Sequence, residues 1–105
     1  IPGIRCHTST TARRHNYSYF PIFVEDAYPA SRDELYSRLQ DAGIRGRRYF
    51  YPLIPEFPMY RNLPGNDRAG WPYAREASER VICLPMYPDV MPRAIEAISK
   101  ILKLP

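Results

Sequence analysis

The stretch SRDELYSRLQDAGI, residues 31–44, decides the fold because it carries a helix with a signal at each end. Ser31 and Glu34 have capping-box spacing, in which the serine hydroxyl accepts the Glu34 amide hydrogen and the glutamate side chain reaches back. Apolar residues follow at helical spacing: Leu35, Leu39 and Ala42. Gly43 supplies the stop. The sequence therefore predicts a helix over residues 31–43, with its leucines in the core.

Runs of aromatic and β-branched residues around this helix predict strands. Residues 17–24 form one run, in which Pro21 indicates an edge strand or a bulge. Residues 44–53 form a second run, and residues 82–85 form a short buried third. Residues 1–16 show no apolar period and are interpreted as a connecting segment.

Two more helices are expected in the second half of the chain. Pro72 suits the first turn of a helix over Pro72–Arg80 with a weak apolar stripe: Ala74, Ala77, Ser78 and Val81. Asp89 can cap a last helix over residues 89–103, in which four apolar residues share one face: Ile95, Ile98, Ile101 and Leu102. Residues 52–70 hold four prolines and two glycines and are predicted to be a loop. The resulting order is β-α-β-α-β-α.

Composition places the chain among ordinary globular domains. Its 105 residues allow one domain, and 45% hydrophobic with 25% charged residues argue against disorder. No apolar run approaches the ~18 residues of a membrane span. Two distant cysteines do not make a disulfide framework, which fits a cytoplasmic protein. Because the chain starts at Ile1 rather than methionine, we expect it to be a piece of something longer.

The positive charge is carried almost entirely by arginine. The net charge is +4, and only Lys100 and Lys103 are lysines. Arginines interleave with aromatic residues over residues 45–51, a pattern that suits an anionic, aromatic ligand. On a strand Arg47, Tyr49 and Tyr51 would share one face. The alternative is a solvated edge strand whose aromatic residues pack on the helices.

Other chemistry is weakly supported by the residues. No serine, cysteine or histidine shows nucleophile–base spacing, and no glycine-rich phosphate loop is present. Cys6, His7 and His15 are too few for a convincing metal site. The basic residues are interrupted by acids and match no nucleic-acid-binding signature. We therefore predict no catalytic, cofactor-binding or metal-ligating residue in this chain, and neither a nucleic acid nor a membrane as partner.

An ordered set of segments covers nearly the whole chain: IPGI (1–4), NYSYFPI (16–22), SRDEL (31–35), DAGI (41–44), YFYP (49–52), WPYA (71–74) and LPMYP (84–88). Together they resemble the C-terminal region of the DegT-type nucleotide-sugar aminotransferases, which use pyridoxal phosphate. The resemblance implies transfer of an amino group, usually from glutamate, to the keto carbon of a nucleotide-linked sugar, here a dTDP-linked deoxyhexose. It also implies active sites at a homodimer interface.

The resemblance also implies a domain organisation. Residues 1–16 would connect to a missing N-terminal large domain that holds the cofactor. Residues 17–105 would form the small α/β domain of the aspartate-aminotransferase superfamily, a short, mainly antiparallel sheet with about three helices packed on it. Arg47, Tyr49 and Tyr51 would line the sugar-nucleotide side of the cleft. Many relatives carry a histidine shortly after the Tyr-Pro pair, and whether Glu56 takes its place is open.

A transaminase needs a lysine that forms a Schiff base with the cofactor. The only lysines here lie in the predicted terminal helix, so we expect no cofactor in this chain alone and no activity from it. Two alternatives to an aminotransferase domain are a stand-alone binding module for nucleotides or nucleic acid, and a purely structural dimerisation piece.

Overall fold

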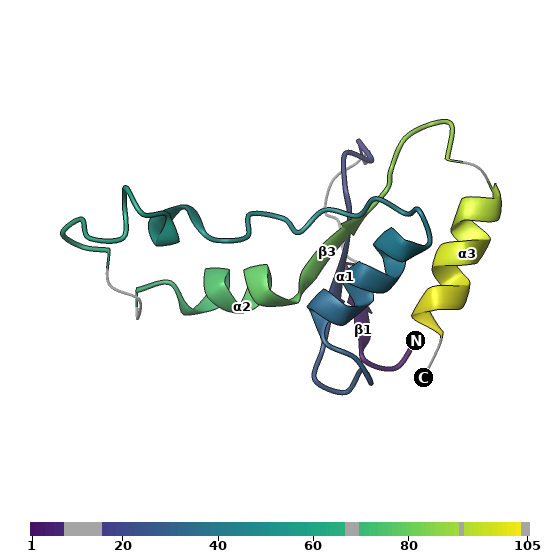
Figure 1. Cartoon of the computed structure of the whole chain (residues 1–105), viewed down its shortest axis with the longest axis horizontal. Coiled ribbons are helices and arrows are strands. Elements are labelled where there is room, and N and C mark those ends of the chain that lie inside the picture. Colours follow the sequence, from purple (N-terminus) through teal and green to yellow (C-terminus); the bar gives the residue numbers. More distant parts are fainter. Residues whose placement is uncertain (8–15, 67–69, 91, 104–105) are drawn as a thin grey trace.

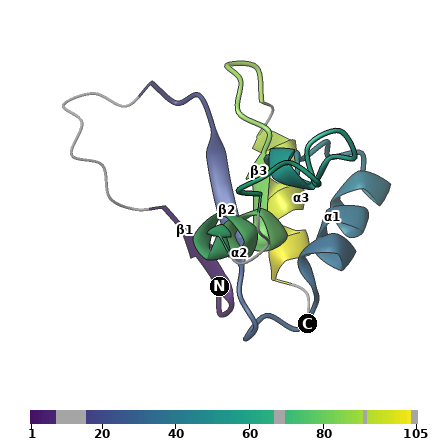
Figure 2. The same cartoon turned by 90° about the vertical axis from the view of Figure 1, so that its left-hand side faces the viewer.

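The computed structural model describes residues 1–7, 16–66, 70–90 and 92–103. Its elements, in chain order, are β1 (Ile4–Cys6), β2 (Phe20–Val24), α1 (Arg32–Asp41), the 3-10 helix η1 (Ile54–Glu56), α2 (Pro72–Arg80), β3 (Val81–Leu84) and α3 (Pro92–Leu102). The three strands form one antiparallel sheet in the order β1-β2-β3 (Figures 1 and 2). The predicted short antiparallel sheet with three helices is confirmed.

The sheet places Pro21 in its central strand with an unbroken register to β3, so the prediction of an edge strand or a bulge is wrong. Pro21 lies opposite Cys83, whose backbone N–H and C=O both bond to Arg47, on the side away from β2. Pro21 and Cys83 therefore form a non-hydrogen-bonded pair. The proline nitrogen consequently faces the β1 side, where β1 has already ended at Cys6 opposite Ile22. No ladder hydrogen bond is lost by having proline there.

The predicted strand over residues 44–53 is also wrong. Arg47 alone bridges to Cys83, and the backbone around it is irregular. Phe50 has a φ of 49°, which is left-handed and incompatible with an extended run. The aromatic residues that suggested a strand, Tyr49, Phe50 and Tyr51, lie instead in a loop with their rings exposed.

The N-terminal segment contributes a strand that the sequence did not reveal. Ile4–Cys6 pairs with Val24–Ile22, whereas the run expected over residues 17–24 becomes a strand only from Phe20. A three-residue strand is too short to show an alternating pattern, so only its pairing identifies it. Residues 8–15 of the predicted connecting segment, including His15, lie outside the described residues.

One face of the sheet carries the core. Its largest fully buried side chains are Ile22, Leu35, Leu39 and Ile82, to which α3 adds Ile98 and Leu102. Helices α1 and α3 pack on this face and against each other, while α2 leaves the sheet on the opposite side from α3 (Figures 1 and 2). The prediction that the leucines of α1 enter the core is confirmed.

The other helices differ from expectation in detail. Helix α3 begins at Pro92, so Asp89 lies too far upstream to be its N-cap; proline favours the first helical position because its missing N–H is not needed there. Ile95 is 57% exposed instead of buried with its predicted neighbours. In α2 only Ser78 of the expected stripe is buried, while Val81 already belongs to β3. None of the described helices is long and apolar enough to cross a membrane.

Both ends of α1 show the geometry that the sequence specifies. Glu34 N donates to Ser31 Oγ at 3.3 Å, and Ser31 N donates to Glu34 Oε2 at 2.7 Å. The Ser31 backbone N–H lowers the pKa of Glu34 below its ordinary value. At the other end Gly43, with a φ of 75°, donates to Gln40 O, and Ile44 N donates to Leu39 O, which is a Schellman motif.

Replacing Ser31 by alanine is expected to lower the free energy of unfolding by about 1 kcal/mol, because the Glu34 amide loses its capping partner. Urea denaturation of the purified chain measures the loss. Ser37→Ala, an exposed substitution in the same helix, is the matched control and should leave stability nearly unchanged. Equal stability of the two variants would contradict the capping role.

Residues 52–66 and 70–80 form an arm that extends away from the sheet (Figure 1). The radius of gyration is 15.7 Å, compared with about 13 Å for a compact domain of this length. Polar contacts close the arm on itself: Glu56 pairs with Arg75, and Asn66 Nδ2 donates to the Pro55 and Tyr60 carbonyls at 2.6 and 2.8 Å. The described residues of the arm thus have their own internal contacts.

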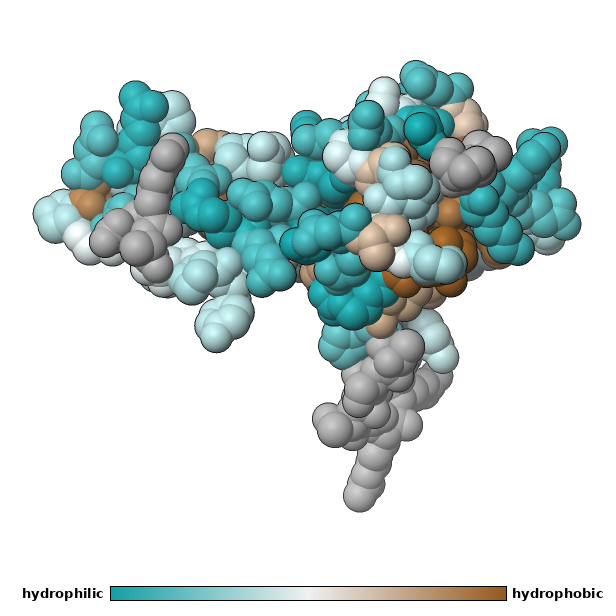
Figure 3. All heavy atoms as spheres, turned by 90° about the horizontal axis from the view of Figure 1, so that it is seen from below, coloured by the Kyte–Doolittle hydropathy of each residue, from teal (hydrophilic) through white to brown (hydrophobic). Residues whose placement is uncertain are grey.

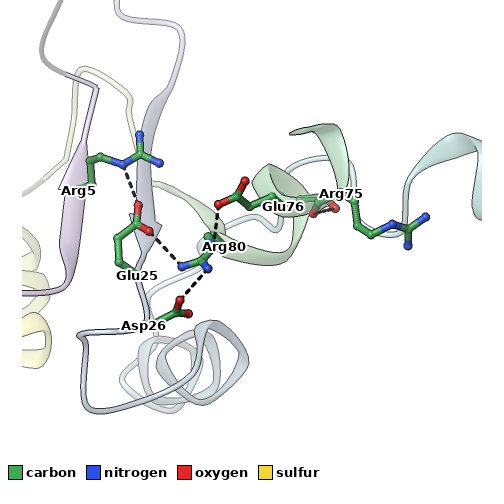
Figure 4. A network of polar contacts seen from close by, with 7 residues as sticks. Arg5, Glu25, Asp26, Arg75, Glu76 and Arg80 are labelled. Carbon is green, nitrogen blue, oxygen red and sulfur yellow. Dashed lines mark hydrogen bonds and ion pairs between the residues drawn. The ribbon is translucent and has the colours of Figure 1, made fainter. Parts of the chain in front are cut away.

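A charged network fixes the base of the arm to the sheet (Figure 4). Arg80, the last residue of α2, pairs with Glu25 and Asp26 at 3.0 Å, and Arg5 of β1 pairs with Glu25 at 2.7 Å. The hydrogen bond to Asp26 raises the pKa of Arg80. Because one network joins β1, the turn after β2 and α2, the direction of the arm is set by the sheet.

Candidate functional site

The three predicted site residues do not share one face. The Arg47 backbone is bonded to Cys83, and its side chain is exposed. Burial raises the pKa of the Cys83 thiol, and the Arg47 charge opposes that rise in part. The rings of Tyr49 and Tyr19 lie 5.1 Å apart, whereas Tyr51 lies among other arginines. The common face argued from strand alternation is lost because this segment is not a strand.

Tyr51 belongs to what we call the arginine–tyrosine cluster: Arg32, Asp33, Tyr36, Arg48 and Tyr51. The guanidinium carbons of Arg32 and Arg48 lie 4.5 and 5.3 Å from the centre of the Tyr51 ring. Arg48 also lies 5.0 Å from the Tyr36 ring. Both distances for Arg48 are within cation–π range, so its guanidinium is held between two aromatic side chains.

Local structure explains how the cluster assembles. Arg32 and Tyr36 stand one helical turn apart on α1 and therefore lie on the same face. The loop after Arg47 then passes α1, which brings Arg48 and Tyr51 to that face. Helix α1 thus supplies Arg32, Asp33 and Tyr36, and the loop supplies Arg48 and Tyr51.

The charges of the cluster are only partly balanced. Asp33 Oδ1 lies 2.8 Å from Arg32 Nε and 3.4 Å from Arg48 Nη1, so one carboxylate pairs with both guanidinium groups. One positive charge is therefore not neutralised within the cluster. The Arg48 side chain is 39% exposed and available to a ligand, whereas Arg32 is buried.

Arg32 holds the cluster in place. Its Nη1 donates to the Ser78 carbonyl at 3.0 Å, which ties the start of α1 to α2. Its Nε is buried and, despite the ion pair with Asp33, makes no hydrogen bond. A buried guanidinium with one strong bond and an aromatic neighbour is a positioning group, and it leaves Arg48 as the accessible cation.

The cluster is suited to binding and not to proton transfer. A guanidinium stays protonated and can pair with a phosphate or carboxylate, and an exposed tyrosine ring can stack on a planar ligand or donate a hydrogen bond. Arg32 and Tyr36 are not among the predicted site residues, because the pattern over residues 31–43 indicates only a helix that packs on the core. Arg48 is not among them either, because strand alternation places it on the face opposite Arg47. The signal that could have found Arg32 and Tyr36 is their i, i+4 spacing.

Glu56, whose role the sequence leaves open, makes its contacts within the arm. Its Oε1 pairs with Arg75, and its Oε2 accepts the Leu53 amide at 3.1 Å. It borders a pocket of about 290 Å³ lined also by Arg61, Asn62 and Trp71. Its two oxygens are thus engaged in holding the arm.

The lysines do not provide a site for pyridoxal phosphate. Lys100 lies in the last turn of α3 and Lys103 directly follows that helix. Both are exposed, beside Ile95, Glu96 and Ser99. A Schiff-base lysine needs an enclosed site with groups that hold the phosphate and the ring nitrogen. The described residues around these two lysines do not fit the cofactor. The described residues also contain no group of three or more potential metal ligands.

Comparison with known proteins connects this geometry to a family. The DegT/DnrJ/EryC1/StrS aminotransferase family profile matches residues 1–103. The chain is 40% identical over 101 residues to a dTDP-4-amino-4,6-dideoxy-D-glucose transaminase of Escherichia coli, and 41% identical over 98 residues to that of Shigella dysenteriae. A GDP-perosamine synthase of Vibrio cholerae is 26% identical over 100 residues. No solved structure shows a significant match to the chain.

The extent of these matches is as informative as their identity. They cover 96%, 93% and 95% of this chain but only 27%, 26% and 26% of the relatives. The chain thus spans about a quarter of the length of the curated relatives, within their C-terminal portion. The family profile matches residues 1–103, so every described helix and strand lies within the match. The chain belongs to the DegT/DnrJ/EryC1/StrS aminotransferase family.

Proposed function

We propose that this chain is the C-terminal small domain of a pyridoxal-phosphate-dependent aminotransferase that acts on a nucleotide-linked keto sugar. The transferred amino group would come from an amino acid, with glutamate as the expected donor, and dTDP as the expected nucleotide. Two of the relatives are named as transaminases of a dTDP-linked amino sugar, and the third as a GDP-perosamine synthase. A stand-alone nucleic-acid module or a purely structural dimerisation piece has no comparable support.

The role of this domain is to bind and orient the sugar nucleotide. The observation that carries this proposal is the half-exposed Arg48 guanidinium, held between the rings of Tyr36 and Tyr51 and not fully neutralised by Asp33. Such a group can pair with a phosphate while Tyr51 contacts the base or sugar. Arg47 and Tyr49 lie on the same loop as Arg48, and they remain in the proposal as residues that line the sugar-nucleotide side of the cleft.

The cofactor would be held elsewhere in the full-length protein. Since the lysines described above do not fit pyridoxal phosphate, no chemical step is assigned to this chain. In this proposal a large domain precedes residues 1–16, and residues 17–105 form the small domain, to which the leading segment adds β1. The full-length enzyme would be a cytoplasmic homodimer.

Arg48→Ala in the full-length protein is expected to weaken sugar-nucleotide affinity about 10- to 100-fold, because a hydrogen bond to a charged group contributes roughly 1.5–3 kcal/mol. The half-reaction with glutamate should stay within about twofold of wild type. Arg47→Ala, measured in parallel, tests whether a second arginine of the loop contributes. Separate single-turnover measurements of the two half-reactions provide both numbers.

Arg45→Ala is the matched control, since Arg45 is an exposed arginine of the same loop outside the cluster. It should change neither half-reaction. Equal losses in both half-reactions for Arg48→Ala would indicate damage to the fold, and a loss in neither would place Arg48 on an ordinary solvated surface. Tight, salt-dependent polynucleotide binding by the wild-type chain would instead support the nucleic-acid alternative.

A further inference from the structure

Both ends of the arm meet the arginine–tyrosine cluster. Tyr51 directly precedes Pro52, where the arm begins. Ser78 lies in the last turn of α2, where the arm ends, and its carbonyl accepts a hydrogen bond of 3.0 Å from Arg32 Nη1. The guanidinium carbon of Arg32 also lies 4.5 Å from the centre of the Tyr51 ring. One side chain of α1 thus contacts the chain where it enters the arm and where it leaves it.

The hydrogen bond between Arg32 and Ser78 is buried and has no substitute nearby. Arg32 is 6% exposed and Ser78 4% exposed. The Ser78 carbonyl is one of the last four of α2, which have no acceptor role within the helix, and the helix dipole favours a cation there. Arg32 Nε makes no hydrogen bond. Without the Ser78 carbonyl, the ion pair with Asp33 would be the remaining polar contact of this guanidinium among the described residues.

The arm itself is held by few buried contacts. Ser78 is its one buried residue among the described positions 52–66 and 70–80. Figure 3 shows the arm, at the left, as mostly hydrophilic on this face. Regions with few buried apolar contacts open locally at a small part of the global free energy of unfolding. We therefore expect the arm to exchange between the closed state described here and an open state.

We propose that Arg32 is a positioning residue that couples the arm to the sugar-nucleotide site, so that a bound nucleotide keeps the arm closed. This inference rests on the proposed function, because it takes Arg48 and Tyr51 as nucleotide contacts. When the arm opens, Arg32 loses the carbonyl that holds it against Tyr51 and Asp33, and Asp33 in turn pairs with Arg48 at 3.4 Å. A ligand that needs the closed arm must stabilise it, because coupling between two equilibria is reciprocal.

Hydrogen exchange in the full-length protein, with dTDP as the probe, measures this coupling. The amides of α2 exchange when the arm opens; that of Arg75, for example, donates to Trp71 O at 2.9 Å. If opening abolishes nucleotide binding, dTDP at ten times its Kd should slow the exchange of peptides covering α2 about tenfold. Peptides from the last turn of α3, where fraying limits exchange, are the internal control and should be nearly unaffected.

Arg32→Lys tests the coupling residue. Lysine keeps the charge, but its compact ammonium cannot reach the Ser78 carbonyl and Asp33 while stacking on Tyr51. At ten times the variant's own Kd, dTDP should slow α2 exchange less than about twofold, so a change in affinity alone cannot produce the result. Arg38→Lys, the same change at an exposed arginine of α1, should keep the tenfold effect. Full protection of α2 in Arg32→Lys would mean that dTDP contacts the arm directly, and would overturn the proposal.

Tyr51→Leu keeps the proposal testable if Arg32→Lys does not fold, because the Tyr51 side chain is largely outside the core, with 42% exposure. It removes the ring between the ligand and Arg32, so α2 protection should again be lost at ten times the variant's own Kd; retained protection would contradict the coupling. Binding of dTDP to wild type without slower α2 exchange overturns the coupling alone. Protection of α2 in a protein that is inactive on dTDP-linked keto sugars overturns the proposed function alone, and failure of dTDP to bind overturns both.

Discussion

Replacing Leu39 by alanine is expected to lower the free energy of unfolding by about 2–5 kcal/mol, measured by urea denaturation of the purified chain. Leu39 is fully buried on the inner face of α1, in one cluster with Leu35, Ile22 and Ile82. Truncation removes the transfer free energy of the side chain and leaves a cavity that packed neighbours fill only in part. A chain of this size has a stability of the same order, so the variant should be close to unfolded.

Leu63→Ala provides the control, because it makes the same chemical change at a leucine of the arm that is 55% exposed. Its effect should stay within about 0.5 kcal/mol. If Leu39→Ala were no more destabilising than Leu63→Ala, the inner face of α1 would not be part of the core.

Gly3→Ala is expected to lower the free energy of unfolding by about 2–5 kcal/mol. Backbone strain contributes about 1–2 kcal/mol of this loss, and overpacking contributes about 1–3 kcal/mol. Gly3 has a φ of 74°, and a Cβ there would lie 2.3 Å from the backbone nitrogen of Tyr28. Backbone atoms cannot yield as a flexible side chain can. The chain can escape the contact only by detaching β1, which breaks the bond from Glu25 N to Gly3 O and ends the protection of that amide from hydrogen exchange.

Gly43→Ala separates the two contributions. Gly43 has nearly the same φ, 75°, but nothing lies within 4 Å of its added Cβ, so only the strain of about 1–2 kcal/mol remains. Gly3→Ala should therefore cost more than Gly43→Ala, and only Gly3→Ala should expose the Glu25 amide. An unprotected Glu25 amide already present in wild type would contradict the contact between Gly3 and the Tyr28 turn.

Local chemistry explains why some elements could be predicted from the chain. The cap at Ser31, the stop at Gly43 and the leucines between them act within a few residues, so α1 follows from its own sequence. Pro72 marks the start of α2 in the same way, and a short apolar run marks β3. The family resemblance also came from the order of such local segments, and the profile match over residues 1–103 confirms it.

The sequence by itself thus determined the helices, the short apolar strand β3 and the family, because their signals are local. Tertiary structure alone decided the strand pairing and the composition of the candidate site. Pro21 is acceptable in the central strand because Cys83 turns its polar groups to Arg47 and because β1 ends at Cys6, opposite Ile22. Arg48, and not Arg47, meets Tyr51 because a left-handed Phe50 interrupts the alternation that a strand would impose. Such contacts join residues distant in the chain, and their geometry depends on packing that no local pattern encodes.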